Sequence, residues 1–268
     1  MRVSKPGRAV TAISTADEQS ITVRNHDLAR DLIGVVSFTE FFFLHVTGHR
    51  PTENQRFFLD ALLVSIAEHG LTHTVLSARM TFAAAPDAMQ AAVAAGVLGC
   101  GTVVLGTAEL CARLLARAAA EAEGKPAAER DAIVLRLARD IHARGERLPG
   151  FGHPLHKPVD PRSVRLLALA DQRGAAGIHV DLLRRLDRAA ATVWGKPLVL
   201  NVSAVIAAIL LDLNFPESAV KGIPILARTA GLIGHLAEER ETPIGFYMAG
   251  KAEEAITYVG GTADTARS

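Results

Sequence analysis

Apolar residues recur at helical spacing through most of this chain. From His26 the spacing is helical up to a break at Thr47-Gly48. After Pro51 a second apolar stripe follows the 3.6-residue period and stops naturally at Gly70. The same spacing predicts further helices over residues 72–84, 86–105, 107–123, 126–143, 160–172, 180–194, 203–213, 216–239 and 251–258.

Hardly any segment alternates in the way that a half-buried strand would. The short apolar runs at Val103-Val104 and at residues 198–200 are compatible with either buried helix or strand. The first 25 residues are polar and irregular, which predicts an arm in place of a packed element. The predicted fold class is therefore all-α, with helices paired through short Gly/Pro loops.

The composition along the chain predicts two domains. Residues 111–147 are rich in Ala, Arg and Glu, and this character returns at residues 173–188, whereas the flanking blocks are more apolar and richer in glycine. We therefore expect residues 1–109 and 200–268 to form a large helical domain, with residues 1–25 as its arm. Residues 110–199 would form a smaller inserted domain, and the cleft between two such domains is the usual ligand site.

Charge and cysteine content narrow the class of protein. The chain has 29 basic and 28 acidic side chains, a net charge of +1, so no global field draws it to nucleic acid or to an anionic membrane. Its longest apolar run, residues 89–104, is interrupted by polar residues, and its start lacks the apolar stretch of a signal peptide. We expect a cytoplasmic protein without a transmembrane segment. Cys100 and Cys111 are expected to be buried, reduced thiols, and no histidine spacing predicts a metal site.

One segment concentrates unusual chemistry: LPGFGHPLHKPVDPR, residues 148–162. Gly150 and Gly152 let a backbone approach a ligand closely beside the His153 imidazole, and the surrounding prolines restrict the chain. Taken by itself, this composition is compatible with a stiff linker between helical blocks or with a catalytic loop.

The spacing in this loop resembles the citrate synthase superfamily, which includes citryl-CoA lyases and the lyase module of ATP-citrate lyase. Proteins of that superfamily carry a Pro-Gly-x-Gly-His loop followed, nine residues after the His, by the Arg of an Asp-Pro-Arg triplet. Here the pair is His153 and Arg162. The similarity runs from about His45 to Glu239, and it implies a citrate synthase-like fold and a homodimer.

The resemblance also implies roles for individual residues. His153 would be the principal catalytic group, and Arg162 would anchor a carboxylate. His69 and Arg228, in segments that resemble the family's Asp-His-Gly and Arg-x-x-Gly helices, would bind the keto-diacid. Two plainer interpretations stay open: His69 could be a helix-terminal histidine, and Arg228 could pair with a surface acid. The adenine of coenzyme A would bind to the backbone of Pro149, Gly150, Phe151 and Gly152, and Lys157 would lie near its phosphates.

Two positions depart from the family's catalytic pattern. Val104, or its neighbour, stands where the early histidine belongs, and Ser203 stands where Asn-Val-Asp places its catalytic aspartate. The segment ETPIGFYM also lacks the family's late arginine. A serine hydroxyl cannot shuttle a proton as a carboxylate does. Another acid, such as Glu68 or a bound water, could serve in its place.

Three functions remain open from the sequence. The first is a lyase that cleaves a 3-hydroxyacyl-CoA such as citryl-CoA to acetyl-CoA and oxaloacetate. The second is a synthase that condenses acetyl-CoA with oxaloacetate or a related keto acid. The third is a non-catalytic acyl-CoA-binding paralogue. In each case the partners would be an acyl-CoA and a di- or tricarboxylate, with the thioester as a substrate and no permanently bound cofactor.

Overall fold

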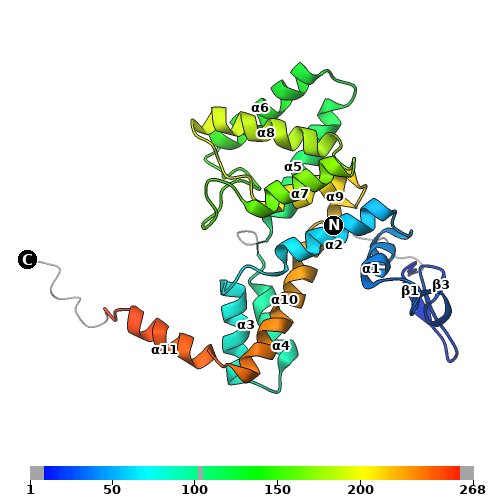
Figure 1. The fold of residues 1–268 in the computed structure, drawn as a ribbon, viewed down its shortest axis with the longest axis vertical. Helices are drawn as coiled ribbons and strands as arrows, with labels where there is room; N and C mark the ends of the chain where they lie inside the picture. The colour runs from blue at the N-terminus through cyan, green and yellow to red at the C-terminus, as the bar shows by residue number, and fades with distance from the viewer. Residues whose placement is uncertain (1–8, 102–104, 260–268) are drawn as a thin grey trace, which may run out of the picture. The chain divides into compact units, whose positions relative to one another are not determined.

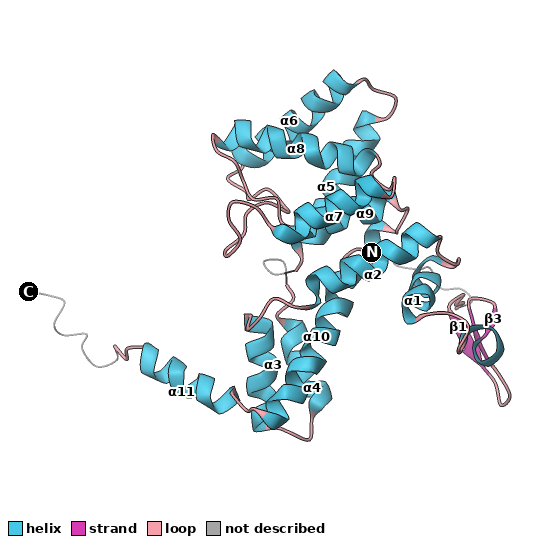
Figure 2. Cartoon of the chain, viewed as in Figure 1, coloured by secondary structure: helices cyan, strands magenta, loops and turns pink. Residues whose placement is uncertain are grey.

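The computed structural model describes residues 9–101 and 105–259, and these residues fold mainly into α-helices (Figures 1 and 2). Contacts divide the chain into two compact units. The first unit comprises residues 1–62 and 108–220, and the second comprises residues 63–107 and 221–268. Helix α2 (Glu53–Ala67) begins in the first unit and ends in the second. The mostly helical fold class predicted from the sequence is confirmed.

Residues 14–27 form a small antiparallel sheet, where the sequence predicted an irregular arm up to residue 25 (Figure 2). Strands β1 (Ser14–Ala16), β2 (Ile21–Val23) and β3 (His26–Asp27) pair in that order. Strands of two or three residues are too short to show alternation, so the apolar pattern could not predict them. The helix predicted from His26 is replaced there by β3 and a short π-helix, η1 (Leu28–Leu32).

Helix α1 (Phe38–Thr47) holds this sheet in place. Ser37 and Glu40 form a capping box at its start, and Gly48 ends it in the left-handed conformation. At its C-terminal end the Arg24 guanidinium donates to the carbonyl of His45 at 2.7 and 3.0 Å. A cation at this end of a helix satisfies exposed carbonyls and is favoured by the helix dipole.

The remainder of the first unit is helical. Its elements are α5 (Thr107–Ala122), α6 (Ala127–Ala143), α7 (Pro161–Gln172), α8 (Ile178–Trp194), α9 (Val202–Asp212) and the 3₁₀ turn η2 (Glu217–Ala219). Helix α9 is central, because every residue from Val202 to Leu210 is buried. Helices α7 and α8 both pack against α9, and α8 also packs along α6 (Figure 1).

The second unit is built from α3 (His73–Ala84), α4 (Met89–Leu98), α10 (Gly222–Glu241) and α11 (Gly245–Ala255). Helices α3, α4 and α10 pack side by side (Figure 1) around a core of buried Val75, Ala78, Phe82, Ala92, Leu232 and Leu236. Arg79 forms a buried ion pair with Glu239. The same carboxylate accepts the N–H groups of Ile244 and Gly245 and so holds the start of α11.

Several predicted helix ends are corrected by the structure. The helix predicted over residues 86–105 ends at Leu98, and Val103-Val104 lies outside the described residues. The last predicted helix begins earlier, at Gly245. The run 198–200 is not helical, since Leu200 pairs with Phe151 in an isolated antiparallel bridge. The division into a large and a smaller inserted domain stays a prediction.

Both cysteines are buried and reduced, as the sequence predicts. Cys100 and Cys111 are both buried free thiols, and complete burial raises the pKa of Cys111 to about 12, which makes it unreactive. Among the described residues, no helix combines the length and apolar character that a membrane span requires.

Candidate active site

The proline-rich loop is tied by its backbone to the segment that leads into α9. The N–H of Gly152 donates to the carbonyl of Val199 at 2.7 Å, and the N–H of Asn201 donates to the carbonyl of Gly150 at 3.0 Å. The Asn201 side chain adds a bond from Nδ2 to the carbonyl of Gly152, also at 3.0 Å. These bonds fix the backbone immediately before His153.

Gly150 occupies a place where no side chain fits. Its φ is +81°, in the region that glycine tolerates and other residues avoid. A Cβ atom there would lie 2.5 Å from the Cβ of Ala204 on α9 and 3.3 Å from the Sγ of Cys111 on α5. The loop backbone therefore lies directly against these two helices.

We expect Gly150→Ala to destabilise the first unit by about 3 kcal/mol, because the left-handed strain and the overlap with Ala204 add together. Gly152→Ala is the matched control: its φ is +86°, yet nothing lies within 4 Å of the added Cβ. Its cost should be the backbone strain alone, about 1 to 2 kcal/mol. Denaturant unfolding of the two variants measures the difference, and equal losses would contradict this packing argument.

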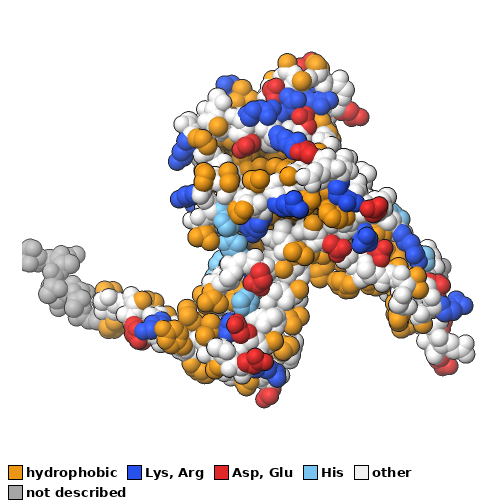
Figure 3. Space-filling model, in the orientation of Figure 1, with side chains coloured by type: hydrophobic (Ala, Val, Ile, Leu, Met, Phe, Trp, Pro, Cys, Tyr) orange, Lys and Arg blue, Asp and Glu red, His pale blue; other side chains and the backbone are white. Residues whose placement is uncertain are grey.

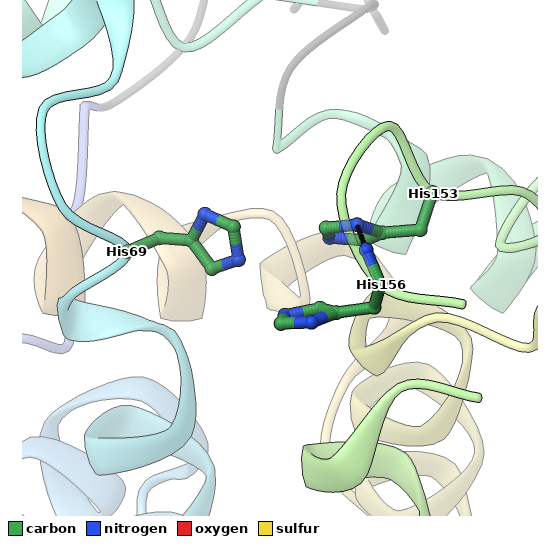
Figure 4. A group of neighbouring side chains, drawn as sticks. All are labelled: His69, His153 and His156. Atoms are coloured by element: carbon green, nitrogen blue, oxygen red, sulfur yellow. Dashed lines mark hydrogen bonds between the residues drawn. The ribbon is translucent and has the colours of Figure 1, made fainter. Parts of the chain in front are cut away.

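His153 is held by its own loop, which turns back on the imidazole (Figure 4). Its Nδ1 accepts the backbone N–H groups of Leu155 at 3.1 Å and of His156 at 2.9 Å. An acceptor nitrogen carries no proton, so the neutral ring carries its proton on Nε2. Nε2 is therefore the atom through which His153 exchanges a proton.

Arg162 faces this nitrogen and is itself held by a buried carboxylate. Its Nη2 lies 3.4 Å from Nε2 of His153. Asp160, whose side chain is fully buried, accepts from Nε of Arg162 at 3.0 Å and from Nη2 at 2.8 Å. Two parallel contacts of this kind fix the plane of a guanidinium as well as its position.

The same carboxylate joins the starts of two helices. Asp160 accepts the N–H of Arg162 at the start of α7 and the N–H of Val202 at the start of α9. Burial alone would raise the pKa of this carboxyl, but the Arg162 guanidinium and the two N–H donors hold the pKa below its usual range. Asp160 is thus ionised near neutrality and organises the surroundings of His153.

Ser203 lies in the first turn of α9 and is buried, with 7% of its surface exposed. Its N–H donates to Oδ1 of Asn201, the N-cap residue, at 3.1 Å. The next residue, Ala204, is the one that Gly150 approaches. The hydroxyl that replaces the family's carboxylate therefore belongs to the helix turn on which the loop rests.

The second unit carries the other two predicted binding residues. His69 follows the end of α2 and is half-buried, and Arg228 lies on α10 with 4% of its surface exposed. The Arg228 charge partly offsets the effect of burial, which raises the pKa of the Cys100 thiol. Beside His69, the carboxylate of Glu68 lies 3.0 Å from Nε2 of His235 on α10.

The remaining predicted contacts with coenzyme A lie along the loop. Gly150 is buried, Pro149 and Phe151 are half-buried, and Gly152 and Lys157 are exposed. By contrast, the arginines of α8 are engaged with acids: Arg184 pairs with Asp171, and Arg185 with Asp131 and Asp181. Figure 3 shows basic and acidic side chains interspersed over α6 and α8, a mixture typical of a solvated helix surface.

The structure thus brings His153, Arg162, the glycine loop and Ser203 together within the first unit, while His69 and Arg228 belong to the second. The sequence reasoning missed Asp160, Asn201 and His156. Asp160 is the first residue of the helix predicted over 160–172, and Asn201 lies two residues before the helix predicted over 203–213. Asp and Asn are favoured as N-caps, so a capping signal was present. Within either unit taken alone, the described residues bring no three imidazole, thiolate or carboxylate groups within reach of one ion.

Comparisons with known proteins identify the family. Residues 9–245 match the family described as "Citrate synthase, C-terminal domain". Citryl-CoA lyase from Hydrogenobacter thermophilus superposes with a TM-score of 0.82 at 29% identity, over 94% of each chain. ATP citrate lyase from Methanothrix soehngenii, solved with citrate and coenzyme A, gives a TM-score of 0.77 at 20% identity, over 99% of this chain and 44% of that one.

Among curated proteins, citrate synthase of Haloferax volcanii is 28% identical over 203 residues, which is 75% of this chain and 51% of that protein. The chain spans about half the length of the curated relatives it matches. The family match covers nearly all of the described residues and includes the loop, Arg162, Ser203 and Arg228. This chain therefore belongs to the citrate synthase superfamily.

Proposed function

We propose that this chain is an acyl-CoA lyase of citryl-CoA type, which cleaves a 3-hydroxyacyl-CoA to acetyl-CoA and oxaloacetate. The structural match to a citryl-CoA lyase over nearly the whole of both chains supports this assignment. The intact His153 loop supplies the proton carrier that this reaction needs. The coenzyme A thioester is a substrate, and no cofactor is permanently bound.

The cleavage conserves atoms and charge. The hydroxyl of citryl-CoA gives up its proton, the bond between the hydroxyl carbon and the thioester CH₂ breaks, and its electron pair forms the thioester enolate. The former hydroxyl carbon becomes the ketone of oxaloacetate. The enolate carbon then takes up one proton and becomes the methyl group of acetyl-CoA.

We assign the hydroxyl proton to Nε2 of His153. In cleavage this nitrogen must be bare to accept the proton, and in condensation it must carry a proton to donate. The two backbone N–H groups at Nδ1 favour the form with the proton on Nε2, whereas the Arg162 charge, 3.4 Å away, favours the bare nitrogen. Cleavage therefore uses the less populated neutral form of the ring, in which Nδ1 carries the proton and Nε2 is bare.

Ser203 stands where the family's carboxylate carries a proton to and from the acetyl-CoA methyl carbon. Removing a proton from the weakly acidic methyl of acetyl-CoA requires a positioned base, and a serine hydroxyl is not one. In cleavage the same group would return that proton to the thioester enolate, a role in which water or a hydroxyl is a weaker substitute. Because the two directions pass through the same transition states, loss of the carboxylate slows this proton transfer in both.

The other predicted residues complete the proposal. His69, Arg228 and Arg162 would bind the carboxylates, for which arginine offers a planar pair of donors. The backbone from Pro149 to Gly152 would bind the adenine of coenzyme A. Lys157, which is exposed on the same loop, would contact its phosphates. We expect the protein to be a homodimer, with α3 and α4 as candidate interface helices; light scattering that gave a monomer would contradict this.

The function is tested by incubating the protein with citryl-CoA and following oxaloacetate through a coupled dehydrogenase. We expect release of oxaloacetate and acetyl-CoA in equal amounts.

The two alternative functions are tested by separate measurements. Condensation of acetyl-CoA with oxaloacetate, followed by the free thiol that it releases, would establish a synthase. Two observations favour a synthase: the proton on Nε2 of His153, which condensation needs, and the relatives named citrate synthase. Acetyl-CoA binding by calorimetry without either reaction would establish a binding protein.

Ser203→Asp tests whether the missing carboxylate limits the rate. We expect the restored carboxylate to raise condensation, and exchange of the acetyl-CoA methyl protons with D₂O, by at least about tenfold, because a positioned base contributes a hundredfold or more when fully aligned. Cleavage should rise together with condensation, because both directions pass through the same proton transfer. Aspartate suits the first turn of a helix electrostatically, so α9 should tolerate it. Ser203→Asn is the uncharged control, and an equal gain from Asn would contradict the role of a base.

A further inference from the structure

The ring of His156 lies against that of His153 (Figure 4). The two ring centroids are 4.3 Å apart, and the planes are inclined by 31°. Both residues are half-buried and come from the same short turn. The sequence assigned no role to His156, and none of the roles proposed above uses its side chain.

His156 contacts His153 in two independent ways. Its backbone N–H donates to Nδ1, and its ring covers one face of the same imidazole. The first contact selects which nitrogen of His153 carries the proton. The second opposes rotation of the ring out of the plane in which Nδ1 meets its two donors, because stacked aromatic rings favour close, offset contact.

We propose that His156 is a positioning residue for His153: its stacked ring holds the His153 imidazole in the orientation that directs Nε2 toward the reacting oxygen and Arg162. The inference rests on the proposed role of His153. It predicts that an aromatic ring of any kind at position 156 suffices, because the stacked face, and not the ring nitrogens, does the positioning. The backbone N–H persists in every variant except proline.

The test compares His156→Ala with His156→Phe. Alanine removes the stack, so we expect the cleavage kcat to fall about threefold to tenfold, the range that one aromatic pair contributes, while KM for the acyl-CoA changes less than twofold. Phenylalanine keeps the stack, so kcat should stay within about twofold of the parent. His142→Ala is the matched control, because His142 also contacts a ring, that of Trp194 at 4.8 Å, in the same unit. It should leave kcat unchanged.

A second readout does not depend on turnover. Nitrogen-15 NMR of histidine-labelled protein reports which ring nitrogen is protonated, and we expect the parent and His156→Phe to show His153 with a bare Nδ1 and a protonated Nε2. His156→Ala should show a mixture of tautomers. Lack of citryl-CoA cleavage by the parent would overturn the proposed function, while the NMR comparison would still decide the role of His156. The inference fails if His156→Ala keeps the parent spectrum, or if His156→Phe behaves as His156→Ala does.

Discussion

Replacing His153 by alanine is expected to lower citryl-CoA cleavage by about a hundredfold to ten-thousandfold, the usual contribution of a positioned general acid or base. The loop should survive the change, since its ladder to residues 199–201 is made by backbone groups and by the side chain of Asn201. Binding of the acyl-CoA should therefore change little, and the loss should appear in kcat.

His153→Asn separates the chemistry from the loop geometry. The amide oxygen of asparagine is placed to accept N–H groups two and three residues ahead, as Nδ1 does here, but asparagine offers nothing at the position of Nε2. We expect it to be as inactive as the alanine variant while unfolding at the parent's temperature. Turnover that persists in both variants, measured by the coupled assay, would remove His153 from the mechanism.

Replacing Asp160 by asparagine is expected to lower both stability and activity. The substitution leaves the Arg162 guanidinium without its charged partner and removes one of the acceptors that join α7 to α9. We therefore expect the free energy of unfolding to fall by about 3 kcal/mol. Arg162 also loses its fixed plane, and we expect kcat/KM to fall at least about tenfold. Denaturant unfolding and the cleavage assay measure the two effects.

Asp212→Asn is the matched control for this variant. Asp212 is also a buried carboxylate that accepts helix-terminal N–H groups, those of Gly177, His179 and Val180. Its side-chain partner is the imidazole of His179, 2.8 Å away, where Asp160 contacts an arginine. It should cost stability without the loss in kcat/KM. In an Arg162→Gln background the catalytic effect of Asp160→Asn should largely vanish, because residues that act as one unit are not additive. Additive losses would show that Asp160 acts independently of Arg162.

The difference in stability between the parent and Asp160→Asn also depends on pH. The pKa of Asp160 is held below its ordinary range in the folded chain, so its contribution is fully present above the unfolded value of about 4 and is lost as pH falls through the folded value. The gap in unfolding free energy between the parent and Asp160→Asn should therefore narrow below about pH 4. A gap that stayed constant down to pH 2 would mean that the carboxylate charge contributes nothing.

The spacing of apolar residues predicted helices well wherever one face of a helix packs against a core. Helices α5, α6 and α8 begin and end within two residues of their predicted bounds, because a 3.6-residue apolar stripe and a Gly or Pro boundary are both visible in the sequence. The same approach failed at β1, β2 and β3, whose order comes from pairing with one another and from Arg24 binding the end of α1. Contacts of that kind have no local periodicity.

The sequence by itself determined the helical class, the superfamily, and the loop that carries His153 and Arg162, since these follow from periodicity and from the spacing of a few residues along the chain. Only the tertiary structure showed that Asp160 reaches the N–H of Val202, 42 residues away, and that Gly150 must be glycine because Ala204 lies against it. It alone placed the ring of His156 on that of His153. Those contacts depend on how a loop, α7 and α9 pack together, and packing between distant segments leaves no mark in local sequence.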